Sequence, residues 1–183
     1  MAEPDPSAAH IFRYLDDGND LVAQQLGKPA PVRPVVAVRL QYGNHRTLVH
    51  SALVDSGSER VIASRVLARE LNIPLPQERA VELGLGGRTR QIVFDQVTIQ
   101  LFRDLMHPGD EPLYEWQADV GFILNDWEPP WAVLLGRDGF FDRFTVTMHG
   151  GVPAMAVEPW ATFDDRFGVQ YQEADNEQPR YQP

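Results

Sequence analysis

The stretch Ala52-Leu53-Val54-Asp55-Ser56-Gly57-Ser58 sets the organisation of the chain. Its apolar residues predict a buried strand that ends abruptly at the carboxylate of Asp55. A carboxylate in that position costs free energy unless polar groups bind it. Gly57 allows a tight backbone turn, and two serine hydroxyls stand within reach. Asp55 is therefore the first candidate for a functional side chain.

The composition predicts a soluble globular protein. The 183 residues are 43% hydrophobic, enough for one domain with a core. No apolar run approaches the roughly 18 residues of a membrane span, so no membrane partner is expected. The absence of cysteine excludes disulfides and thiol chemistry. Together with an acidic N-terminus unlike a signal peptide, it predicts a cytoplasmic protein.

The net charge and the spacing of the histidines limit which partners and cofactors are expected. The net charge is −10, and residues 1–31 and 158–183 carry most of it. The remaining middle of the chain is nearly neutral and has no basic stripe, so no nucleic-acid partner is expected. The five histidines lack the short spacing of metal ligands. We therefore expect neither a metal nor another cofactor.

Three segments are expected along the chain. Residues 1–31 are predicted to be an N-terminal helical extension and linker, because Ile11, Phe12 and Leu15 share a face at helical spacing. A removable pro-segment covering an active site is the alternative. Residues 32–158 are predicted to form the folded domain. Residues 159–183 are predicted to be an acidic, flexible tail.

The middle segment carries the alternating apolar pattern of strands and predicts a mainly β fold. Strands are expected over residues 35–41, 47–54, 81–85, 89–94, 97–101, 114–124, 132–135, 144–148 and 152–157. A helix is expected over residues 61–72, where apolar residues recur at helical spacing before Pro74. A second, shorter helix is expected over residues 140–143. The run 132–135 is apolar throughout, which is typical of a strand buried on both faces.

Three motifs in this order resemble those of the retropepsin-like aspartic proteases. They are Leu53-Val54-Asp55-Ser56-Gly57-Ser58, Gly84-Leu85-Gly86-Gly87 and Leu134-Leu135-Gly136-Arg137-Asp138. The resemblance covers roughly residues 32–157. It implies a mainly β acid-protease lobe, closed like a barrel, and an active site shared by two identical lobes.

The chemistry of peptide hydrolysis also predicts an active site shared by two identical chains. Water needs a base to activate it and an acid to protonate the substrate, and two close carboxylates sharing one proton supply both. The chain holds one Asp-Ser-Gly motif and is too short for two full lobes. We therefore expect a homodimer with Asp55 from each chain. The expected activity is that of an aspartic endopeptidase acting on peptide or protein substrates.

The resemblance also implies roles for single residues around the motif. Asp55 is the expected catalytic acid and base, and Ser56 the hydroxyl that braces the two active loops across the dimer axis. Gly57 is expected to hold the carboxylate through its N–H group. Ser58 stands where the family often has alanine. Its hydroxyl could bind the ionised carboxylate, which would favour an acidic optimum.

The other two motifs imply a flap and an ion pair. Leu85, Gly86 and Gly87, together with Ser58, are expected to contact substrate, although Arg88 and Arg90 make the hairpin more charged than an apolar seal. Arg137 is expected to pair with Glu59, which stands where the family has aspartate. The longer glutamate side chain makes the geometry of this pair the point to examine.

Other interpretations of these residues remain open. Asp55 alone is also typical of a tight turn. The same fold could serve as a binding or dimerisation module with little or no catalysis. A serine hydrolase is disfavoured because Ser58 lacks the flanking glycines of a nucleophile elbow. Trp127 and Trp131 could line a peptide cleft or simply pack.

Overall fold

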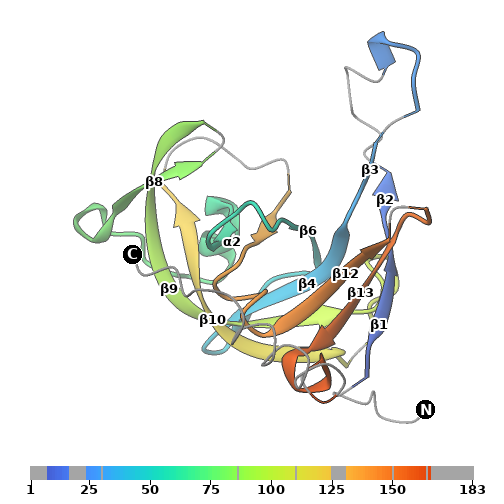
Figure 1. The fold of residues 1–183 in the computed structure, drawn as a ribbon. Coiled ribbons are helices and arrows are strands. Elements are labelled where there is room, and N and C mark those ends of the chain that lie inside the picture. Colours follow the sequence, from blue (N-terminus) through green and yellow to red (C-terminus); the bar gives the residue numbers. More distant parts are fainter. Residues whose placement is uncertain are drawn as a thin grey trace, which may run out of the picture.

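The computed structural model describes residues 8–16, 24–29, 31–85, 87–109, 111–124, 131–149, 151–163 and 165, and this part of the chain is mainly β (Figure 1). The helical segments with complete bounds are α2 (Arg65–Glu70) and η1 (Gln77–Arg79), and residues 24–25 and 160–163 are also helical. The strands are β1 (His10–Arg13), β2 (Leu15–Asp16), β3 (Val32–Arg33), β4 (Val35–Tyr42), β5 (His45–Arg46), β6 (His50–Val54), β7 (Val61–Ala63), β8 (Val81–Leu85), β9 (Arg88–Phe102), β10 (Tyr114–Ile123), β11 (Val133–Leu135), β12 (Phe144–His149) and β13 (Ala154–Pro159).

Six strands close into a barrel. Their hydrogen-bonded order is β4-β6-β11-β7-β10-β9, and β9 returns to pair with β4. β9 can close the barrel because it is a single long strand. It was predicted as two, but residues 88–102 run continuously and pair along their length with β8, β10 and β4. The expectation of a mainly β, barrel-like domain is confirmed.

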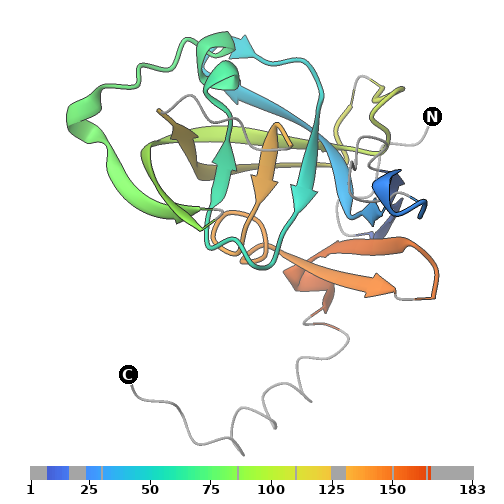
Figure 2. The ribbon, with the colours of Figure 1, turned by 90° about the horizontal axis from the view of Figure 1, so that it is seen from above.

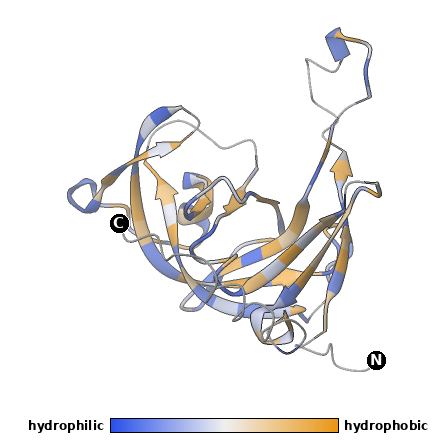
Figure 3. Ribbon diagram, in the orientation of Figure 1, coloured by the Kyte–Doolittle hydropathy of each residue, from blue (hydrophilic) through white to orange (hydrophobic). Residues whose placement is uncertain are grey.

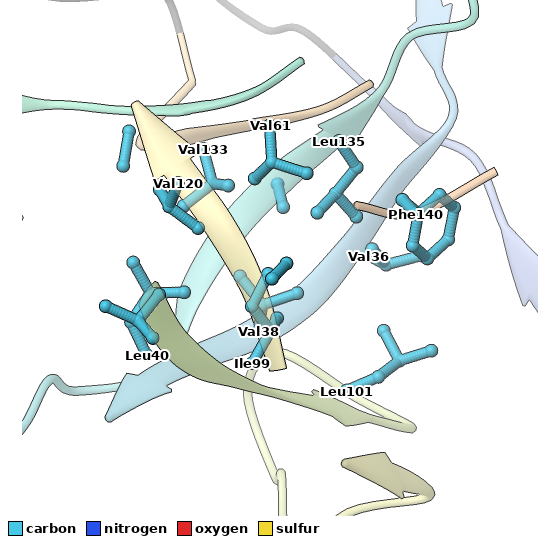
Figure 4. Close-up of a cluster of buried hydrophobic side chains, with 14 of the residues drawn as sticks. Val36, Val38, Leu40, Val61, Ile99, Leu101, Val120, Val133, Leu135 and Phe140 are labelled. Atoms are coloured by element: carbon cyan, nitrogen blue, oxygen red, sulfur yellow. The ribbon is translucent and has the colours of Figure 1, made fainter. Parts of the chain in front are cut away.

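The barrel is filled by apolar side chains from every strand. Figure 4 shows Val38, Val61, Ile99, Val120 and Leu135 pointing toward one another from five different strands. All five are at most 1% exposed. Figure 3 shows hydrophobic residues alternating with hydrophilic ones along the strands around this interior. Such a core stabilises the fold through the apolar area that it removes from water.

β11 lies between β6 and β7 (Figure 2). It runs parallel to β6, with Leu134 opposite Leu53, and antiparallel to β7, with Leu134 opposite Ile62. All three residues of β11 are buried, as predicted for a strand covered on both faces. The chain thus leaves β6 at Asp55, turns, and comes back as β7 on the far side of β11.

The helix predicted in the N-terminal extension is wrong over residues 8–16, whereas residues 24–25 are helical as expected. Residues 10–13 form β1, which pairs with β13 in a three-stranded sheet of order β1-β13-β12. Phe12 is buried in the barrel's core cluster while Ile11 is 68% exposed. The alternation has period two, and the open edge of β13 supplies backbone partners that no sequence window could reveal.

Several other boundaries differ from the prediction. The helix expected over 61–72 is two elements, because residues 61–63 are taken up by β7 and only α2 is helical. Residues 140–143, expected as a short helix, form a turn. The strand expected from residue 47 begins at His50. Residues 61–63 form a strand despite their helical spacing because they pair with strands on both sides, β11 and β10.

No helix in the described ranges is long and apolar enough to cross a membrane. The flexible tail predicted from residue 159 is wrong at its start, because Pro159 ends β13 and residues 160–163 are helical. Residues 166–183 of the tail, and residues 1–7 and 17–23 of the extension, lie outside the described residues.

Candidate active site

Asp55 follows the last residue of β6 and is half-buried. Its N–H donates to the carbonyl of Leu135 at 3.1 Å, which continues the pairing of β6 with β11 by one residue. Asp55 therefore leaves the barrel where two parallel strands end together. A side chain at this point starts from a rigid backbone and reaches the surface.

The turn after Asp55 is held by the aspartate itself. The N–H of Gly57 donates to Oδ1 of Asp55 at 3.0 Å, as expected from the sequence. The N–H of Ser58 donates to the carbonyl of Asp55 at 3.1 Å. A side chain at Gly57 would put its Cβ 3.1 Å from the same Oδ1. The carboxylate is thus oriented by one backbone donor, and glycine leaves its neighbourhood open.

The two serines of the motif are placed differently. Ser56 is exposed at the tip of the turn. Ser58 is only 9% exposed, and its hydroxyl donates to the carbonyl of Arg60 at 2.8 Å. The expectation that Ser58 would bind the carboxylate of Asp55 is wrong, because the hydroxyl is turned back to its own loop. The acidic pH optimum expected from that hydrogen bond therefore has no support from Ser58.

The segment after β11 runs beside this turn. The N–H of Arg137 donates to the carbonyl of Ser58, and that of Asp138 to the carbonyl of Glu59, both at 2.9 Å. Residues 60 and 138 then form a parallel bridge. These bonds join the Asp55 turn to the Gly136-Arg137-Asp138 segment by backbone alone.

Gly136 is needed for this close approach. A Cβ there would lie 2.6 Å from the carbonyl carbon of Arg60 and 2.8 Å from its nitrogen, closer than real Cβ atoms come. The contact is with backbone, so no side-chain rotation can relieve it. Glycine at this position lets the two segments touch.

Two ion pairs cross the same junction. Arg137 reaches Glu59 with 3.4 Å between Nη2 and Oε1, so the pair predicted from the sequence forms. Both side chains are more than 60% exposed, which makes the pair weak within one chain. Arg60 pairs with Asp138 beside it. The sequence analysis missed this second pair, although opposite charges next to Glu59 and Arg137 were a signal for it.

A pocket of about 300 Å³ opens in front of Asp55. The turn contributes Asp55, Gly57, Ser58 and Glu59, and β8 contributes the other wall with Leu83, Gly84 and Leu85. The sequence analysis singled out Leu85 but missed Leu83, whose two-residue spacing from Leu85 on one strand was the available signal. Ser58 and Leu85 are thus brought together with Asp55 as expected.

β8 and β9 form the predicted hairpin. Leu85 pairs with Arg88, so the tip of the hairpin lies between these two residues. Gly87 has φ of +73°, a conformation that glycine adopts readily. Gly86 itself lies outside the described residues.

The tryptophans behave as packing residues where they are described. Trp131 packs against a small apolar cluster of Ile62, Ile92, Ile123 and Leu134. Trp127 lies outside the described residues. Trp116 was not singled out, yet its indole N–H donates to the buried carbonyl of Gly139 at 2.7 Å and so supports the segment after Arg137.

Comparison with protein-family models and with curated proteins gives no match. In the described part of the chain, no group of three or more histidine, aspartate or glutamate side chains is placed to hold a metal ion.

Proposed function

We propose that the protein is an aspartic endopeptidase of the retropepsin-like kind, active as a homodimer with one Asp55 from each chain. The observation that carries the proposal is the setting of Asp55: a half-buried carboxylate at the end of a barrel strand, oriented by the N–H of Gly57 and open to a pocket beneath a hairpin. The closed β fold supports it, as do Gly84 and Leu85, which line the pocket, and Arg137 and Asp138, whose N–H groups bind the turn after Asp55.

Within one chain, Glu59 is the other described carboxylate that lines the pocket. Its Oε1 lies 3.4 Å from Nη2 of Arg137, so this carboxylate is already engaged in an ion pair. Glu59 and Asp55 are therefore not equivalent carboxylates. A second Asp55, brought by a two-fold axis, would be equivalent to the first, and equivalent carboxylates at short range share one proton.

The chemistry then follows from the pair. The ionised Asp55 accepts a proton from water, and the hydroxide formed attacks the carbonyl carbon of the scissile peptide bond. The protonated Asp55 gives its proton to the carbonyl oxygen, leaving a tetrahedral diol. Collapse of the diol re-forms the carbonyl group, breaks the C–N bond and transfers a proton to the leaving nitrogen.

The test is a digest of a peptide library at acid and at neutral pH by the wild type and by Asp55→Asn, with the size of each in solution. We expect cleavage by a dimeric wild type and none by a dimeric Asp55→Asn. Cleavage that survives the substitution overturns the proposal.

The charged hairpin, with Arg88 at its tip, favours a second candidate: a dimerisation or peptide-binding module on the same fold. A wild-type protein that binds library peptides but cleaves none at either pH would support it.

A further inference from the structure

The hairpin that walls the pocket carries arginines on the same face as its leucines. Directly paired residues of an antiparallel hairpin project from one face. Leu83 pairs with Arg90 and Leu85 pairs with Arg88. Since Leu83 and Leu85 line the pocket with Asp55, both arginines extend from the face of the hairpin that is turned toward it.

Along β9, burial on this face falls toward the tip. Ile92 is fully buried in the small apolar cluster, Arg90 is half-buried and Arg88 is exposed. Figure 3 shows the start of β9 as hydrophilic. The face of the hairpin that lines the pocket through Leu83 and Leu85 therefore also carries the exposed Arg88, which lies opposite Leu85 at the tip.

The charge of Arg88 is not matched by nearby acids in the described residues. Glu82, the acid of the same hairpin, pairs with Gln91 and so extends from the opposite face. Two acids line the pocket, Asp55 and Glu59, and Glu59 pairs with Arg137. Among the described ion pairs none includes Arg88. In a chain of net charge −10, this is a local positive rim.

We propose that Arg88 selects peptides with an aspartate or glutamate side chain beside an apolar residue at the cleaved bond. The inference rests on the proposed peptidase function and specifies its substrates. The apolar side chain packs on Leu83 and Leu85, and the neighbouring carboxylate meets the guanidinium of Arg88. A guanidinium can bind a carboxylate through two parallel hydrogen bonds, which an amide cannot reproduce.

The test uses matched peptides that differ only by glutamate or glutamine next to the cleaved bond. We expect kcat/KM for the glutamate peptide to be higher by roughly fivefold, the upper range for a partly exposed charge pair. The preference should shrink as ionic strength rises, because salt screens exposed charges.

Two substitutions identify the residue responsible. Arg88→Gln should bring the glutamate-to-glutamine ratio close to one. Arg88→Glu should reverse the preference in favour of a matched lysine peptide. Arg46→Gln is the control, because Arg46 is an exposed arginine of a different hairpin and does not line the pocket. It should keep the wild-type ratio.

Binding to Asp55→Asn separates this inference from the proposed function. Tighter binding of the glutamate peptide that is lost with Arg88→Gln supports the selection even if the wild type cleaves nothing. Cleavage or binding without preference between the two peptides overturns the selection by Arg88. Cleavage without preference still supports the proposed peptidase function. Absence of both cleavage and binding overturns both.

Discussion

The α-carbon of Gly136 lies against the backbone of Arg60, so close that a Cβ would come within 2.6 Å of the Arg60 carbonyl carbon. This contact joins the end of β11 to the turn that carries Asp55. It turns two distant stretches of sequence into one structural unit, and its consequences can be measured.

Gly136→Ala should lower the free energy of unfolding by about 1–3 kcal/mol, the usual cost of overpacking. The clash is with backbone, so the turn after Asp55 must shift to relieve it. Urea denaturation measures the loss. Gly84→Ala is the control, because a Cβ there meets nothing within 4 Å and its φ is not positive. Equal stability of the two variants would contradict the close contact.

Asp55→Asn and Asp55→Ala should differ in stability. The amide oxygen of asparagine can still accept the N–H of Gly57, whereas alanine leaves that donor without its partner. We expect asparagine to be nearly neutral and alanine to cost about 1 kcal/mol. Thermal unfolding of both variants at one pH decides this. Matching melting temperatures would show that the bond does not stabilise the turn.

An equal mixture of wild-type and Asp55→Asn chains should have about one quarter of the peptidase activity of wild type at the same total chain concentration, because random assortment makes one dimer in four fully wild type. The measurement is activity after the mixed subunits have exchanged. A control with Arg46→Gln chains should keep full activity. If half the activity remains in the first mixture, each chain holds a complete site.

The Glu59–Arg137 pair should couple by less than about 1 kcal/mol in the free energy of unfolding of a single chain, since both side chains are exposed. A double-mutant cycle with Glu59→Gln and Arg137→Gln measures this. A larger effect of the same cycle on the dimer dissociation constant would locate the pair at the interface between chains. Strong coupling within the monomer would contradict the exposed geometry.

Trp116→Phe should cost about 1–3 kcal/mol, because the buried carbonyl of Gly139 loses its donor. Trp160→Phe is the matched control. Its indole N–H donates to Phe141 in an exposed setting, where water can replace it. Chemical denaturation should therefore separate the two variants. A loss as large for Trp160→Phe would contradict the role of burial.

Acid stability should depend on Asp104. The N–H groups of Met106 and His107 donate to its Oδ1 and hold its pKa below the ordinary value of 3.8. A lowered pKa in the folded state stabilises the protein above the unfolded pKa, and this is lost as pH falls through the folded value. Carboxyl titration by NMR measures the pKa directly, and a value above 3.8 would refute the prediction.

The sequence predicted the parts of the site that depend on local chemistry. An acid, a hydroxyl and a glycine after an apolar run imply a tight turn, and the structure has the Gly57 donor in place. Gly136 and Arg137 could be paired with that turn through the motif order, and the Glu59–Arg137 contact forms.

The remaining features depend on partners far along the chain. The N-terminal strand could not be recognised because Ile11 and Phe12 fit helical spacing, while the edge of β13 that orders them comes more than a hundred residues later. The direction of the Ser58 hydroxyl was equally hidden, since Arg60 offers its carbonyl only once the turn has closed.

The place of β11 between β6 and β7 also governs when the site can appear during synthesis. β6 and β7 leave the ribosome long before residues 133–135, and without β11 they have no common neighbour. Contacts this distant in sequence form late in folding. A nascent or truncated chain ending before β11 would carry Asp55 on an unsupported turn. Activity would therefore begin only once nearly the whole barrel had been made.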